Sequence, residues 1–213
     1  MMPAAVIVVT ALCAGASGFG LSRWARVLAG AESRWLRTWI LVAFTSLGGV
    51  GAAMTAESAA ELFAYSLLAV SLAVLVVVDL AVFRLPDLVV GPLYLVLFGS
   101  LTVAAAIDGD WGRLGRAAAA AGIIALGYFV LLLIAPANLG LGDVKLAGVI
   151  GAFLGWLGWP NALVGTLAAF VLGGVFALGL VVARRAHRHT AFAFGPWMVA
   201  GAAVGAAFGS TVV

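Results

Sequence analysis

Charged side chains are scarce in this chain. Only 9% of the 213 residues are charged, 65% are hydrophobic, and the mean hydropathy is +1.24. A chain with so little charge is not a water-soluble domain. The formal charge of +3 comes from basic residues in short connections between apolar segments. That arrangement is typical of residues that set membrane orientation, so we expect no nucleic-acid partner.

Cysteine is nearly absent as well. Cys13 is the only one, so the sequence excludes a disulfide within the chain and a cysteine-based zinc site. The two histidines, His187 and His189, stand among arginines, which favours a solvated loop over a metal site. We therefore expect a protein that works without a bound metal and without a resident cofactor.

Long apolar runs fill most of the sequence. Runs of about 18 residues or more are typical of membrane spans. Because lipid cannot satisfy backbone polar groups, spans are helices or closed barrels, and continuous runs favour helices. With no sign of a linker or repeat, we predict one all-α domain over residues 1–213 with about eight transmembrane helices. Their expected ranges are 3–21, 38–55, 62–83, 88–107, 117–135, 144–159, 162–183 and 192–212.

The basic residues divide unequally between the two sides of such a bundle. The first run has two arginines after it and none before it, the reverse of a cleaved signal peptide, so we expect a retained helix. Arg113 and Arg116 lie in an expected loop on one side. The other side takes Arg23, Arg26, Arg34, Arg37, Arg84, Lys145, Arg184, Arg185 and Arg188. Basic loops stay in the cytoplasm, so we predict both termini outside.

Two aspartates stand out against this apolar background. Asp79 lies five residues before Arg84, about 7–8 Å inside the expected membrane boundary. A charge at full depth costs roughly 2.5 kcal/mol or more, so it usually faces a protein interior or a wet cavity. Asp143 precedes an apolar run shorter than the roughly 20 residues needed to cross. Its loop could therefore enter the protein at membrane depth, on the same cytoplasmic side as Asp79.

Two such carboxylates can form a hydrolytic pair. Repulsion between them leaves one ionised and one protonated. The ionised one takes a proton from water, and the protonated one polarises the scissile carbonyl, with no need of a metal. Gly140 and Gly142 could adopt positive φ beside Asp143 and let a substrate backbone approach.

Each of these residues also has a plain structural interpretation. Asp143 could be the N-cap of the following helix, and Asp79 could be a helix-end charge that reaches the interface. Asp87, after Pro86, is typical of the first turn of a helix. Lys145 could be an interfacial anchor. Two glycine stripes predict close helix packing with no chemistry, one over Gly148, Gly151, Gly155 and Gly158 and one over Gly201, Gly205 and Gly209.

At these residues the chain resembles the type IV prepilin peptidases, the aspartic membrane proteases of the GxGD group. Their first motif is an Asp near a helix end followed by Ile/Leu-Pro-Asp/Asn, here Asp79 with residues 85–87. The second is Gly-x-Gly-Asp-x-Lys-Leu, here residues 140–146. A later Phe-Gly-Pro element, residues 194–196, is also similar. The resemblance covers most of the chain, from the second to the eighth expected helix.

The resemblance implies a GxGD-protease-like fold and an aspartic endopeptidase. Its substrate would be a prepilin-like protein, whose leader is removed at the cytoplasmic face of a prokaryotic plasma membrane for type IV pilus assembly or protein secretion. The implied catalytic residues are Asp79 and Asp143, and the implied substrate-binding or supporting residues are Pro86, Asp87, Gly140, Gly142 and Lys145.

One feature of the family is missing. Many bacterial members also N-methylate the new N-terminus with S-adenosylmethionine, and many carry paired CxxC zinc motifs between the first two helices. Residues 23–37 contain no cysteine and are too short for such a domain. This absence argues against zinc and weakens the case for methylation, so S-adenosylmethionine would be needed only if methylation is retained.

Two other classes of protein stay open. A small transporter or channel could use Asp79 and Asp143 as a proton or cation relay. Acids near one face rather than the midplane argue against it, as does the lack of repeat symmetry. A membrane scaffold that packs through its glycine stripes would leave the costly Asp79 unexplained.

Overall fold

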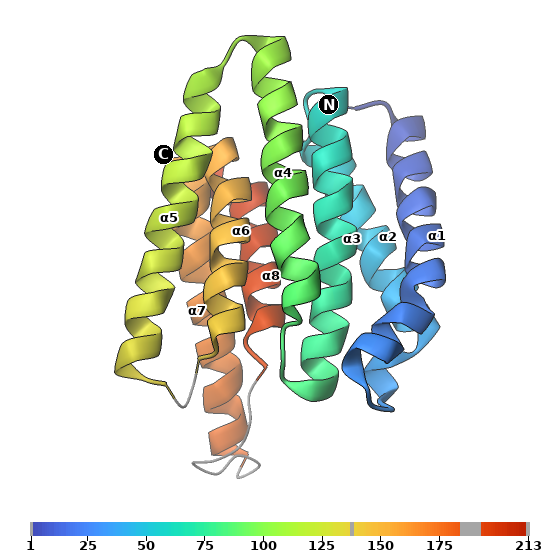
Figure 1. Cartoon of the computed structure of the whole chain (residues 1–213), viewed down its shortest axis with the longest axis vertical. Coiled ribbons are helices and arrows are strands. Elements are labelled where there is room, and N and C mark those ends of the chain that lie inside the picture. Colours follow the sequence, from blue (N-terminus) through green and yellow to red (C-terminus); the bar gives the residue numbers. More distant parts are fainter. Residues whose placement is uncertain (1, 137–138, 184–192, 212–213) are drawn as a thin grey trace. The chain divides into compact units, whose positions relative to one another are not determined.

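The computed structural model describes residues 2–136, 139–183 and 193–211, and these residues form helices and no strand (Figure 1). The helices are α1 (Ala4–Ala29), η1 (Arg34–Leu36), α2 (Thr38–Thr55), α3 (Ala59–Val82), α4 (Asp87–Asp108), α5 (Trp111–Ile134), α6 (Leu141–Leu157), α7 (Trp159–Val182), α8 (Gly195–Phe208) and η2 (Gly209–Thr211). The predicted all-α class is confirmed. The chain divides into two compact units, Met1–Leu114 and Gly115–Val213.

Six helices of the described chain are long and apolar enough to cross a membrane: α1 to α5 and α7. The α8 helix is apolar but has only 14 residues, and α6 has 17. This pattern fits the predicted polytopic membrane protein.

The first helix is longer than predicted. It continues to Ala29, so Arg23 and Arg26 belong to the helix and not to a loop. Arginine is a good helix former, which is why a charge at the membrane boundary does not end the helix. The end comes at Gly30, whose φ of 58° is the left-handed conformation that favours glycine.

Two other helices begin earlier than predicted because side chains cap them. The Ser58 hydroxyl accepts a hydrogen bond from the Glu61 backbone N–H at 3.2 Å, which starts α3 at Ala59. The Asp110 carboxylate likewise accepts from the Arg113 N–H at 3.1 Å and starts α5 at Trp111. Arg113 is therefore helical, and its guanidinium lies 2.9 Å from the buried Glu61 carboxylate.

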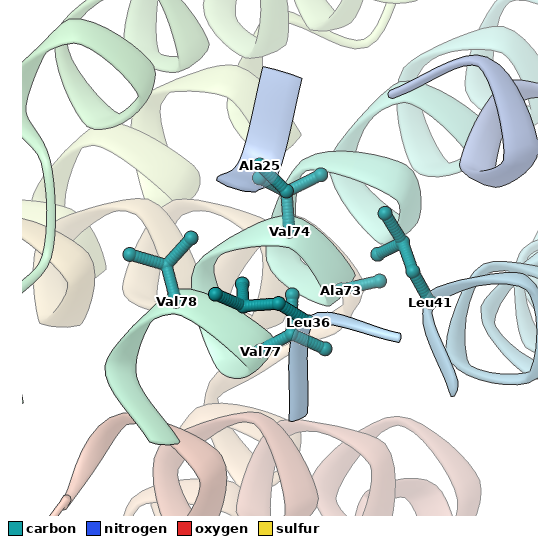
Figure 2. Close-up of a cluster of buried hydrophobic side chains, with 7 residues drawn as sticks. All are labelled: Ala25, Leu36, Leu41, Ala73, Val74, Val77 and Val78. Carbon is teal, nitrogen blue, oxygen red and sulfur yellow. The ribbon is translucent and has the colours of Figure 1, made fainter. Parts of the chain in front are cut away.

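A core cluster in the first unit joins the connection after α1 to the second half of α3. Figure 2 shows its side chains, which are Ala25, Leu36, Leu41, Ala73, Val74, Val77 and Val78. Leu36 belongs to η1, and its cluster partners on α3 directly precede Asp79. The arginine-rich connection between α1 and α2 therefore lies at the same end of this unit as Asp79.

The predicted glycine stripe of the last helix is a close-packing surface against α7. A Cβ built on Gly201 would lie 2.5 Å from the Gly165 carbonyl oxygen, and one on Gly205 would lie 2.6 Å from the Asn161 carbonyl oxygen. The Asn161 amide also donates to the Gly205 carbonyl at 2.9 Å. Small residues are needed here because the two backbones almost touch.

We expect Gly205→Ala to lower the stability of the protein. The added methyl meets the backbone of α7, and overpacking of this kind costs typically about 1–3 kcal/mol. Gly174→Ala on α7 is the matched control, because nothing lies within 4 Å of a Cβ there. The control should melt at the parent temperature or slightly above it. Thermal unfolding in detergent measures both, and equal melting temperatures for the two variants would contradict the close packing.

Candidate active site

Asp79 lies in the last turn of α3 and is only 4% exposed. Every residue from Leu72 to Asp79 is buried, so this half of α3 is enclosed on all sides. The burial favours a carboxylate that faces the protein interior over one that reaches an exposed interface. Isolated charges are not buried without compensation, so a carboxylate at such a position is a candidate for function.

The backbone directly after Asp79 turns sharply. Phe83 has φ 53° and ψ 40°, and it is the one residue other than glycine with positive φ in the described part of the chain. Its N–H donates to the Asp79 carbonyl at 2.8 Å and closes α3. Such a conformation costs an ordinary residue roughly 1–2 kcal/mol. It turns the chain out of α3 only four residues after the carboxylate.

Asp87 is the first residue of α4, and Pro86 is its N-cap. The prediction that Asp87 belongs to the first turn of a helix is confirmed. The side chain is exposed, in contrast to that of Asp79. A carboxylate in this position stabilises the helix through its dipole, which is a sufficient reason for an acid there.

Asp143 lies one turn further into its helix than predicted. The α6 helix begins at Leu141, so Asp143 is its third residue, and the N-cap is Gly140. The specific interpretation of Asp143 as the N-cap is therefore wrong. Its Oδ2 nevertheless accepts a hydrogen bond from the Gly140 N–H at 2.8 Å, which closes the first turn. This bond uses one of the two carboxylate oxygens.

The glycines of the second motif do not act as predicted. Gly140 has an extended conformation with φ −104°, and Gly142 is helical. Among the described glycines, φ lies in the left-handed region only at Gly30 and Gly109. The proposed need for positive φ beside Asp143 is therefore wrong, whereas close approach of a substrate backbone stays a prediction. Lys145 is exposed on α6, as an interfacial residue would be.

The predicted site residues fall into two groups. Asp79, Pro86 and Asp87 belong to the first unit, whereas the residues from Gly140 to Lys145 belong to the second. Within each unit the residues of one motif lie on one short stretch of backbone. The meeting of the two aspartates stays a prediction.

An aromatic cluster in the second unit was not predicted from the sequence. The Tyr128 ring on α5 lies 5.2 Å from that of Phe170 on α7 and 6.1 Å from that of Phe194, the N-cap of α8. Phe194 opens the Phe-Gly-Pro element, so this element packs against Tyr128. The sequence carries no signal for Tyr128, because a tyrosine in an apolar helix is ordinary.

Among the residues that the structure describes, no three His, Cys, Asp or Glu side chains gather in a way that could hold a metal ion. The two histidines, His187 and His189, lie outside the described residues.

Comparison with known proteins identifies the family. The model of the type IV leader peptidase family matches residues 66–178 of the chain, a range that contains both Asp79 and Asp143. The chain belongs to the type IV leader peptidase family. The family suggested by the two motifs is thereby confirmed, although the Phe-Gly-Pro element lies beyond the matched range.

Curated relatives support the family. The prepilin leader peptidase/N-methyltransferase of Aeromonas salmonicida strain A449 is 33% identical over 162 residues, which cover 72% of this chain and 52% of that protein. The protein of the same name from Aeromonas hydrophila gives the same identity and coverage. The chain thus spans about half the length of these relatives. No solved structure matches the chain.

Proposed function

We propose that this leader peptidase family member removes the leader from type IV pilin-like precursors as an aspartic endopeptidase, with Asp79 and Asp143 as its catalytic pair. The observation that carries the proposal is Asp79, a carboxylate only 4% exposed near the end of an apolar helix. It lies in a family-matched range that also contains Asp143. A leader is a peptide segment, so the reaction is hydrolysis of one peptide bond.

The path of the chain supports a meeting of the two aspartates. Between them lie α4 and α5, and each is long and apolar enough to cross the membrane once. Two crossings return the chain to the face that it left. Asp79 near the end of α3 and Asp143 near the start of α6 would then lie at the same face, which we propose is the cytoplasmic one.

The proposed mechanism uses one shared proton. Two carboxylates in close contact cannot both be ionised, so one is charged and the other is protonated. The charged one takes a proton from water while the water oxygen bonds to the scissile carbonyl carbon. The protonated one gives its proton to the carbonyl oxygen. When the C–N bond breaks, the leaving amine takes a proton from one carboxyl, and the other recovers one from the hydrated carbonyl.

The supporting residues have simpler roles. The Gly140 N–H holds one oxygen of Asp143, which orients the carboxylate. Pro86 and Asp87 start α4 and fix the connection after Asp79. Gly142 leaves room for a substrate backbone near the catalytic carboxylate, and Lys145 is an exposed cation on the same helix. We propose that these residues bind or support the substrate.

The proposed setting is a prokaryotic plasma membrane, with both termini outside. The curated relatives are named for an N-methyltransferase activity as well. Residues 23–37 of this chain contain no cysteine, so we propose that leader removal is its main activity. S-adenosylmethionine would be required only for methylation.

Co-expression with a prepilin-like precursor tests the function directly. Leader removal shortens the precursor, and a gel shift measures it. The precursor should be shortened in cells that make this protein and stay intact in cells that do not. A precursor that stays intact with the protein correctly inserted in the membrane, across several pilin-like sequences, would overturn the proposal.

We expect metal chelators to leave leader removal intact. The proposed mechanism needs only two carboxylates and water, whereas a zinc enzyme needs three or four protein ligands. The purified protein would be assayed with the precursor before and after treatment with a chelator. A loss of activity that added zinc restores would contradict the metal-free mechanism.

A further inference from the structure

The contacts between α5 and α6 define how these two helices are aligned. The Arg116 guanidinium donates to the Gly155 carbonyl at 2.7 Å and to the Trp156 carbonyl at 2.9 Å. One turn further along α5, the Ala120 carbonyl oxygen lies 2.9 Å from a Cβ built on Gly151. A step of four residues toward the end of α5 thus corresponds to a step of four residues toward the start of α6. The two helices are therefore antiparallel and in close contact.

Continued along both helices, this alignment pairs Tyr128 with Asp143. Residue 116 faces 155 and residue 120 faces 151, so two further steps of four residues pair 128 with 143. Residues four apart stay on one face of a helix.

The inner face of α5 explains why a tyrosine stands there. Its buried residues are Ala117, Ala120, Ala121 and Tyr128. The alanines let α6 approach closely at Gly151 and Gly155, whereas the large Tyr128 ring packs against Phe170 and Phe194. Of these four side chains, only the tyrosine carries a polar atom. A polar atom on an otherwise apolar face requires a partner when it is buried.

The Tyr128 ring is also held in place. Phe170 and Phe194 lie on it from α7 and from the start of α8, and their own rings are 5.5 Å apart. Tyr128 is 3% exposed. A ring packed in this way cannot change its rotamer without disturbing α7 and the start of α8.

We propose that Tyr128 is a positioning residue for Asp143, with its hydroxyl donating a hydrogen bond to the carboxylate oxygen that Gly140 does not hold. The proposal rests on the proposed function, because it assigns Tyr128 a role in the reaction of that carboxylate. In this proposal Gly140 holds one oxygen of Asp143, as observed, and Tyr128 would hold the other while the substrate reacts. Catalysis is sensitive to such placement, since small errors in geometry reduce the rate strongly.

Tyr128→Phe tests the proposal, because it removes the hydroxyl and keeps the ring packing. We expect kcat for leader removal to fall about tenfold, as removal of one hydrogen bond to a charged group does. KM should stay within about twofold, and the melting temperature should not change. Unchanged kcat, or a loss confined to KM, would overturn the positioning role. Tyr65→Phe is the matched control, since Tyr65 is 2% exposed on α3 and lies about 21 Å along the helix from Asp79.

Asp143→Asn in the same assay separates the two proposals. If Asp143→Asn still cleaves, the aspartic mechanism fails. If Asp143→Asn is inactive while Tyr128→Phe keeps its full kcat, only the role of Tyr128 fails. Equal losses in Tyr128→Phe and Tyr65→Phe would also overturn it, because they would indicate a general effect of losing a buried hydroxyl.

A second measurement tests the geometry without any activity. In a Cys13→Ser background, the pair Tyr128→Cys and Asp143→Cys should form a crosslink with a short bis-thiol reagent, detected by mass spectrometry after proteolysis. The pair Gly127→Cys and Asp143→Cys is the control, because Gly127 is exposed on another face of α5. Absence of the first crosslink, or equal yields from both pairs, would overturn the alignment.

Discussion

Asp79→Asn and Asp143→Asn should each abolish leader removal while the protein still inserts into the membrane. Asparagine has nearly the same shape as aspartate, so packing around each residue is kept. What each variant loses is the transfer of a proton between two acids, and general acid–base catalysis alone contributes typically about 10²–10⁴-fold. Because asparagine keeps the shape of the side chain, we expect the Asp79→Asn variant to stay folded with a melting temperature close to that of the parent. Leader removal by gel shift and thermal unfolding in detergent measure the two effects.

The hydrogen bond at the start of α6 makes Asp143→Asn a clean test. The carbonyl oxygen of asparagine can accept the Gly140 N–H as the carboxylate does, so the helix start is preserved. If Asp143 served only to stabilise this turn, the variant would stay active. Substantial cleavage at normal expression would therefore end the aspartic protease hypothesis. Loss of cleavage in a variant with an intact α6 would mean that the acid itself is required.

Two further variants complete the series. The double variant should be hardly worse than either single one, because the two acids act as one unit. Asp87→Asn should retain most activity, since the exposed Asp87 starts α4 and asparagine fulfils that role too. If the loss of activity in the double variant were as large as the two single losses combined, the result would contradict a pair that shares one proton. An inactive Asp87→Asn with a normal melting temperature would assign Asp87 to the reaction.

The apolar runs predicted the helical class because lipid leaves the backbone few choices. The apolar runs did not predict the residues at which the helices begin. The starts of α3 and α5 depend on single side-chain hydrogen bonds, those accepted by Ser58 and Asp110. Each is worth roughly 1 kcal/mol, which a count of apolar residues does not register. The start of α6 also depends on one side-chain hydrogen bond, from the Gly140 N–H to Asp143. For this reason Asp143 lies inside the first turn of α6 and not in the loop before it.

The candidate site was predicted only in part. The two aspartates could be found because a charge in an apolar run is costly and therefore conspicuous. Tyr128 gave no such signal, since a tyrosine among alanines and leucines is ordinary in a membrane helix. Its partners Phe170 and Phe194 are distant in sequence and come together only through tertiary packing. Arg116 was predicted in a loop, yet it joins α5 to the end of α6.

A reporter that works only outside the cytoplasm should be active when fused after Asp108 and silent when fused after Ala31. The reason is the division of basic residues, nine on one side of the predicted bundle and two on the other. Because of the core cluster, the fusion after Ala31 also reports on the side of the membrane at which Asp79 lies. Because Leu36 packs against the α3 residues just before Asp79, the connection after Ala31 and the Asp79 carboxylate lie at the same end of their unit.

Silence after Ala31 would therefore assign Asp79 to the cytoplasmic side, on which we propose that the leader is removed. Fusions after Val213 and at Ala186 lie outside the described residues and give independent tests, with activity expected at the first and silence at the second. A reporter of the opposite preference, active only in the cytoplasm, controls for expression at each position. Activity after Ala31 with silence after Asp108 would reverse the orientation. It would place the buried carboxylate on the side where leader removal from a cytoplasmic precursor cannot occur.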